Sequence, residues 1–149
     1  MSTPAKRLAT YEDILGLPED VRAEVIAGEV LVQPFPTPSH QFVLSELYTE
    51  LTNPFQRGRG GPGGWWFIQD VDVDFGVHDI YRPDIAGWRR ERVARFPATR
   101  PVRERPDWLC EGLSPRTALR DQGESVRRTR RSACPGIGWP IRRIEPSPP

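Results

Sequence analysis

The order of apolar and polar residues predicts short helices and strands that alternate along most of the chain. Segment 10–13, TYED, has the spacing of an N-terminal capping box, so we expect a short helix through Leu15. A second helical stretch is predicted from Val21 to Ala27, with Gly28 as its left-handed C-terminal cap. The apolar segment 29–32, EVLV, then indicates a strand.

A longer helix is predicted to begin at Ser39, which can cap it. Apolar residues recur on one face of this helix: Val43, Leu44, Leu47 and Leu51. Asn53 and Pro54 should end it, because proline removes a helical hydrogen bond.

The second half of the chain is richer in strand patterns. From Trp65 to Phe75 apolar residues alternate with Asp70, Asp72 and Asp74, whose side chains we interpret as the solvated face of one strand. Further strands are predicted over 81–88 and 107–113, separated by a charged loop over 89–106, and a helix is predicted to begin near Thr117. This order favours an α/β or α+β domain with a mixed sheet flanked by helices.

Composition bounds the class of protein. The 149 residues are enough for one domain with its own core, and the apolar runs are far shorter than the roughly 20 residues of a membrane-spanning helix. Residues 1–10 lack the apolar stretch of a secretory signal, so the expected location is the cytoplasm. Cys110 and Cys134 have no metal-binding neighbours at zinc spacing, and we expect both to be thiols.

Charge adds one unusual feature. The net charge is only +1, but Lys6 is the only lysine among 21 basic residues, a bias that we attribute to a G/C-rich genome. The Gly- and Arg-rich segment 57–64 suggests a phosphate-binding loop, yet it lacks the Gly-Lys-Ser/Thr ending of such loops. We therefore interpret it as a flexible connector.

Two carboxylates on predicted strands could act together. Asp84 follows Arg82 and Pro83 in one strand, and Glu111 lies inside another. Hard divalent ions such as Mg²⁺ take oxygen ligands, and in phosphodiester cleavage they activate water and neutralise developing charge. The alternative is structural: Asp84 would cap a turn and Glu111 would pair with an arginine.

Several motifs occur in an order that resembles a known family. They are segment 11–13 (YED), Glu24 with 28–32 (GEVLV), 36–40 (PTPSH), 82–84 (RPD), 111–117 (EGLSPRT) and 120–124 (RDQGE). Together they resemble the Uma-type putative restriction endonuclease family over roughly 10–124. That family belongs to the PD-(D/E)XK nuclease superfamily, so the resemblance implies this fold and metal-dependent hydrolysis of DNA.

The resemblance also implies roles for particular residues. Asp84 and Glu111 would be ligands of Mg²⁺, with Mn²⁺ as a substitute, and Glu29 would be a supporting catalytic acid. The family's lysine after Gly-Glu orients the attacking water, but here that position is Ser125, so we expect impaired activity. His40 matches a family histidine, although an ordinary first-turn helix residue explains it equally well. Gly112 stands where the family has a β-branched residue.

The last 25 residues depart from the family pattern. Arginines and prolines interrupt any apolar period in 125–149, where the resemblance implies a helix and a buried strand. Loss of one adenine would explain this, because GAG AAG CGT (Glu-Lys-Arg) becomes GAG AGC GT, which reads Glu124-Ser125-Val126. In the restored frame the next codons can encode the Tyr-Ala-Ala and Tyr-Trp-Leu segments of the family.

These patterns predict a flexible N-terminus over 1–9, an endonuclease-like domain over 10–124 and an aberrant, disordered tail over 125–149 that leaves a sheet edge open. The alternative for the tail is a genuine Arg-rich segment that binds nucleic acid. Two other functions stay open: a non-catalytic nucleic-acid-binding protein that uses Arg57, Arg59 and the tail, and an interaction module or non-functional remnant.

Overall fold

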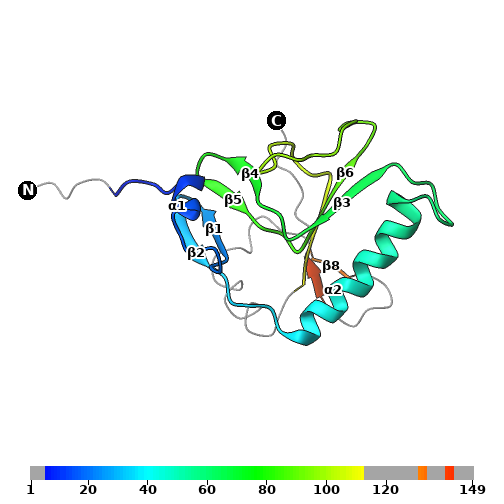
Figure 1. The fold of residues 1–149 in the computed structure, drawn as a ribbon, viewed down its shortest axis with the longest axis horizontal. Coiled ribbons are helices and arrows are strands. Elements are labelled where there is room, and N and C mark those ends of the chain that lie inside the picture. The colour runs from blue at the N-terminus through cyan, green and yellow to red at the C-terminus, as the bar shows by residue number, and fades with distance from the viewer. Residues whose placement is uncertain (1–5, 113–130, 134–139, 143–149) are drawn as a thin grey trace, which may run out of the picture.

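The structure is a computed structural model that describes residues 6–112, 131–133 and 140–142, which form two antiparallel sheets and one long helix (Figure 1). Its helices are α1 (Tyr11–Leu15), α2 (Pro38–Leu51) and a π-helical turn, η1 (Thr52–Gln56). Its strands are β1 (Ala23–Ile26), β2 (Glu29–Val32), β3 (Trp65–Gln69), β4 (Val73–Gly76), β5 (Asp79–Tyr81), β6 (Ile85–Arg89), β7 (Trp108–Gly112), β8 (Arg131–Ala133) and β9 (Pro140–Arg142).

The first sheet has the strand order β2-β1-β5-β4. The predicted helix over 21–27 is wrong, because this segment is β1 and pairs with β2 on one side and β5 on the other. Ala27 and Gly28 have φ angles of 50° and 77°, the left-handed pair that a two-residue β-hairpin turn requires. Gly28 therefore adopts the expected left-handed conformation in a hairpin rather than at a helix end.

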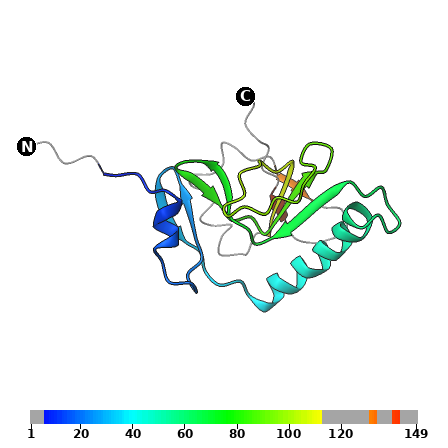
Figure 2. The same cartoon turned by 45° about the horizontal axis from the view of Figure 1, so that its top comes forward.

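Helix α1 lies against β1 at the N-terminal end of the molecule (Figure 2). The expected short helix is confirmed, and the Thr10 N–H donates to the Asp13 carboxylate at 2.8 Å. Ile14 packs with Val25 in the core of this sheet. Ala9 is buried and its N–H donates to the Gly28 carbonyl, so the ordered part begins before the expected boundary at residue 10.

Helix α2 runs along one face of the second sheet, whose strand order is β3-β6-β7-β9-β8 (Figure 2). Leu44 and Leu47 pack against Phe67, Ile85 and Cys110, which confirms the predicted apolar face. The helix is capped two residues earlier than expected: the Thr37 hydroxyl, rather than that of Ser39, accepts the His40 N–H. The α-helix ends at Leu51, and η1 carries the chain through Pro54 to Gln56.

Two predicted strands are each divided between the sheets. The strand expected over 65–75 breaks at Asp70, whose φ of 51° is left-handed, so β3 joins the second sheet and β4 the first. The strand expected over 81–88 breaks at Pro83, so β5 lies in the first sheet and β6 in the second. The two places where the chain passes from one sheet to the other are in contact, because the Asp70 N–H donates to the Asp84 carbonyl. Asp70 and Asp84 are thus placed where the sheets meet.

The α/β or α+β class is confirmed, although all named strands pair antiparallel and the parallel contact described is one isolated bridge, Val73 with Val102. The strand predicted over 107–113 is β7. The expectation of an open edge beyond it is corrected, since β9 pairs with β7 and β8 pairs with β9. The helix expected near Thr117, Cys134 and the rest of the tail lie outside the described residues. Within the described part, no helix is long and apolar enough to cross a membrane.

Candidate functional site

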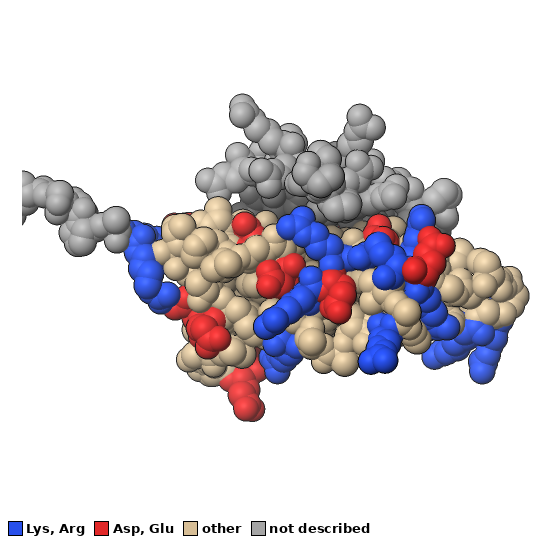
Figure 3. Space-filling view, turned by 90° about the horizontal axis from the view of Figure 1, so that it is seen from above, with Lys and Arg blue, Asp and Glu red and all other residues tan. Residues whose placement is uncertain are grey.

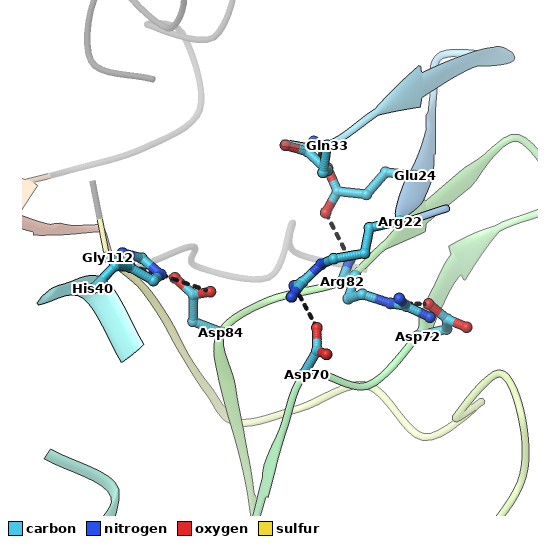
Figure 4. Close-up of polar contacts among 9 residues, drawn as sticks. All are labelled: Arg22, Glu24, Gln33, His40, Asp70, Asp72, Arg82, Asp84 and Gly112. Carbon is cyan, nitrogen blue, oxygen red and sulfur yellow. Dashed lines mark hydrogen bonds and ion pairs between the residues drawn. The ribbon is translucent and has the colours of Figure 1, made fainter. Parts of the chain in front are cut away.

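Asp84 stands at the start of β6, immediately after the buried Pro83, and its carboxylate points toward the end of β7 (Figure 4). The Gly112 N–H donates to Oδ2 of Asp84 at 2.6 Å. The Nε2 atom of His40 lies 3.3 Å from Oδ1. Both side chains are largely enclosed, with exposed fractions of 18% for Asp84 and 11% for His40. These contacts hold the carboxylate in one orientation.

Glu111 is placed on the strand beside Asp84. Ile85 pairs with Cys110 in the antiparallel register of β6 and β7, and one further step of that register sets Asp84 opposite Glu111. Asp84 itself precedes β6, so the direction of its side chain is set by the contacts with Gly112 and His40 rather than by the strand. The approach of the Asp84 and Glu111 carboxylates remains a prediction.

Glu29 does not reach this place. It lies at the hairpin end of β2, beside the turn where the Gly28 N–H donates to the His78 carbonyl. Its side chain is 62% exposed and pairs with Lys6 at 2.9 Å. The structure therefore brings Asp84 and Glu111 onto neighbouring strands and leaves Glu29 outside.

Glu24, in the hairpin of β1 and β2, points toward Arg82, in the segment between β5 and β6 (Figure 4). Its Oε1 accepts the backbone N–H of Arg82 at 2.7 Å, and its Oε2 accepts the side-chain amide of Gln33 at 2.7 Å. Burial raises the pKa of the Glu24 carboxyl, and the negative charge of Asp84 raises it a little further. The hydrogen bonds from Arg82 and Gln33 lower it, but burial has the larger effect. Glu24 thus ties the first sheet to the RPD segment that carries Asp84.

Arg82 is fixed from a second side by Asp72. The Nε atom of Arg82 donates to Oδ1 of Asp72 at 2.7 Å, and Oδ2 accepts the Tyr11 hydroxyl at 2.9 Å. Asp72 is only 1% exposed, so the interpretation of a solvated face is wrong for this residue. The strand break at Asp70 turns Asp72 inward, where the charge of Arg82 compensates its burial.

A cavity of about 180 Å³ opens beside Asp84. It is lined by Arg22, Gln41, Leu44, Ser45, Gln69, Asp70 and Asp84. Arg22 pairs with Asp70 across this cavity, and its buried Nε–H has no hydrogen-bond partner among the described residues (Figure 4). The Arg22 guanidinium, the Asp70 and Asp84 carboxylates and polar side chains of α2 therefore line the same cavity.

The sequence did not predict that Arg22, Glu24 and Asp70 lie at or beside the site. Arg22 and Glu24 are two residues apart, which places them on one face of a strand but on different faces of a helix. Their common orientation could be read only if β1 had been recognised as a strand. Asp70 carried no signal, because the alternation of apolar and polar residues runs through the break.

The donor atoms of the site suit a hard divalent ion. Asp84 keeps lone pairs beyond the two used by Gly112 and His40, because each carboxylate oxygen has two. Magnesium is commonly held by one or two carboxylates together with water and substrate phosphate. Within residues 6–112 no cluster of three or more His, Cys, Asp or Glu side chains is close enough to hold an ion alone. The pair Asp84 and Glu111 is the candidate ligand set.

Comparisons with known proteins point to one family. A family model described as Uma2, putative restriction endonuclease, matches residues 8–139. Among solved structures, the chain is similar to a putative nuclease belonging to DUF820 from Anabaena variabilis, at 25% identity and a TM-score of 0.55. The similarity covers 76% of this chain and 64% of that one, so the chain spans slightly less than two thirds of the Anabaena protein. The comparison with curated proteins gave no match.

Proposed function

Because the chain belongs to the Uma2 family of putative restriction endonucleases, we propose that its cleft is a metal-dependent site for hydrolysis of DNA phosphodiester bonds. The observation that carries this proposal is the placement of Asp84. Its carboxylate is anchored by the Gly112 amide and His40, lines a cavity and stands opposite Glu111 in the register of β6 and β7.

Asp84 and Glu111 would hold Mg²⁺, or Mn²⁺ in its place. The bound ion supplies charge neutralisation at the phosphate and lowers the pKa of a water molecule. His40 fixes the Asp84 carboxylate through its Nε2, and the Gly112 N–H fixes the other oxygen. These two contacts keep Asp84 pointed at the cavity without occupying all of its lone pairs.

Arg22 is the phosphate-binding residue of this proposal. It lines the cavity with Asp84, and guanidinium groups bind phosphate oxygens through fixed pairs of N–H donors. One terminal nitrogen of the guanidinium pairs with Asp70, and the other terminal nitrogen would donate to a phosphate oxygen in the cavity. Asp70 holds the group in place from the other side.

Glu24 takes the supporting role that the resemblance gave to Glu29. It does not touch the cavity lining directly; it holds the Arg82 backbone, two residues before Asp84. Displacing Arg82 would move the start of β6 and with it the Asp84 carboxylate. Glu24 is therefore a positioning residue.

The chain should be a weak nuclease. Its residue at the family's lysine position is Ser125, which lies outside the described residues and cannot supply a cation to orient water or neutralise charge. Restoring the lysine alone should help little, because a catalytic group acts only when its surroundings hold it in place. The repaired reading frame would return the lysine together with the helix and strand that follow it in the family.

Nicking of supercoiled plasmid in Mg²⁺ or Mn²⁺ tests this proposal. Four proteins are compared: the chain as it stands, Ser125→Lys, the frame-restored chain and the frame-restored chain with Asp84→Ala. We expect cleavage by the frame-restored chain only, and its loss with Asp84→Ala. Robust cleavage by the original chain that disappears with Asp84→Ala would show that the tail does not impair it. Absence of divalent-dependent cleavage by the frame-restored chain would contradict the nuclease function.

A further inference from the structure

The connection between β6 and β7 is strongly basic. Residues 89–106 contain seven arginines and two glutamates. The connection leaves β6 at Arg89, the opposite end of the strand from Asp84. At about 3.3 Å per residue along a strand, the two positions are about 16 Å apart. The view from above shows basic side chains spread over this side of the molecule, with acidic side chains among them (Figure 3).

Four of these arginines build the connection itself, and one of them, Arg105, donates to the Phe75 carbonyl at 2.9 Å. Arg92 donates to the Asp107 carboxylate at 2.9 and 3.1 Å. Arg90 donates to the Trp65 and Gln56 carbonyls and stacks 3.8 Å from the centre of the Trp66 ring. Arg100 donates to the Tyr11 hydroxyl. These contacts give the loop a defined shape.

Two other arginines of the connection make no such contact, and the Arg89 guanidinium lies 5.4 Å from the centre of the Trp65 ring. Arg95 and Arg103 are exposed, and neither has a hydrogen bond or ion pair with any described residue. Arg89 pairs with Glu91 at 3.6 Å, a contact in which the two side chains are 56% and 77% exposed. Such an exposed pair is weak and exchanges readily with another anion. The connection therefore carries exposed positive charge, on Arg95 and Arg103, that no described acidic side chain neutralises.

An exposed aromatic ring lies next to this charge. Phe96 follows Arg95 directly and is 52% exposed. It packs edge-on against Trp66, with ring centres 5.7 Å apart, so one ring edge is anchored. An anchored, exposed ring beside unpaired guanidinium groups is the combination that single-stranded nucleic acids use, because bases stack on the ring and phosphates pair with the arginines.

We propose that Arg89, Arg95, Phe96 and Arg103, here called the arginine face, bind a single-stranded stretch of nucleic acid outside the cleavage cleft. A duplex would use the arginines alone, because its bases are already stacked. An acidic protein would use the charge without needing the ring. The inference rests on the proposed function only in sharing nucleic acid as a partner.

Binding is measured by fluorescence anisotropy with a labelled single-stranded DNA oligonucleotide in EDTA, so that no cleavage is needed. Arg95→Ala with Arg103→Ala should weaken binding about tenfold and reduce the salt slope by about 1.4, since each lost phosphate contact on a single strand contributes about 0.7. The same variant with lysine at both positions should retain the slope. Lys6→Ala with Arg7→Ala removes the same charge elsewhere and should change binding little.

Phe96 distinguishes base stacking from simple charge attraction. Phe96→Ala should weaken single-stranded binding about tenfold with an unchanged salt slope, and should leave duplex binding unaltered. Phe96→Leu keeps the contact with Trp66 but not the ring, so it should weaken binding as Phe96→Ala does. Circular dichroism checks that both variants fold.

Three results would overturn the proposal. One is equal loss of binding in the Lys6/Arg7 control, and a second is unchanged affinity of the Phe96 variants. A third is equal or tighter binding of heparin or poly-glutamate, which would show attraction to any polyanion. Failure of the frame-restored chain to nick plasmid, with intact binding by the arginine face, would contradict the cleavage site and leave this inference standing.

Discussion

Substitution of Gly112 by alanine should disturb the candidate site through one collision. A Cβ atom at this position would lie 2.8 Å from Cε1 and 3.2 Å from Nδ1 of His40, and 3.5 Å from Oδ2 of Asp84. His40 is only 9% exposed and cannot move aside freely. Overpacking of this kind costs about 1–3 kcal/mol. Alanine in place of glycine in a strand otherwise stabilises by about 0.5–1 kcal/mol, so a net loss of about 1–2 kcal/mol is expected.

The prediction is tested by urea unfolding followed through the fluorescence of the five tryptophans. Gly16→Ala is the matched control, because a Cβ atom there meets only backbone oxygens at 3.6 and 3.8 Å. In a His40→Ala background the collision is absent, and Gly112→Ala should become neutral or stabilising. An equal loss of stability with and without the His40 ring would refute the reasoning.

The other predictions concern the two acids that support Arg82. Burial raises the pKa of the Glu24 carboxyl, so the folded chain holds this proton more tightly than the unfolded chain. The free energy of unfolding should therefore fall as pH rises above about 4.5, and it should level off above the raised pKa. Glu24→Gln should flatten this dependence in urea midpoints measured from pH 4 to 7, and an unchanged slope would contradict the assignment. Asp72→Ala should destabilise by about 3 kcal/mol, because it leaves the Arg82 guanidinium half-buried without a partner. Glu91→Ala, which removes an exposed pair, should have little effect in the same urea unfolding assay, and similar losses for both variants would count against the buried network.

The elements that sequence predicts well are those whose periodicity alone determines them. Helix α2 has four apolar residues on one face, and α1 has its capping residues. Strand β1 could not be predicted in this way, because its VRAEVIA segment suits a helix locally. Its extended form depends on partners on both sides, since Val25 pairs with Val30 and with Ile80.

The candidate site follows the same division. Asp84 and Glu111 were recognised from motifs; the pairing of β6 with β7 brings their segments together, and their joint role as ligands stays a prediction. Arg22 and Asp70 line the cavity at the point where the chain passes from one sheet to the other. This passage depends on the left-handed backbone of Asp70, which no local sequence pattern predicts. Glu29 was assigned a role from the family resemblance alone, and the hairpin that turns Glu24 toward Arg82 was not recognised from the sequence.

The central claim is that Asp84 and Glu111 form one divalent-ion site, and Mn²⁺ titration followed by electron paramagnetic resonance tests it most directly. We expect saturable Mn²⁺ binding that Asp84→Asn and Glu111→Gln each weaken by about 10- to 100-fold, while Asp20→Asn, an exposed control, leaves it unchanged. The loss in the double variant should be less than the sum of the two single losses, because both carboxylates serve the same ion. Equal Mn²⁺ affinity in the original chain and in Asp84→Asn, with both folded by circular dichroism, would contradict the claim.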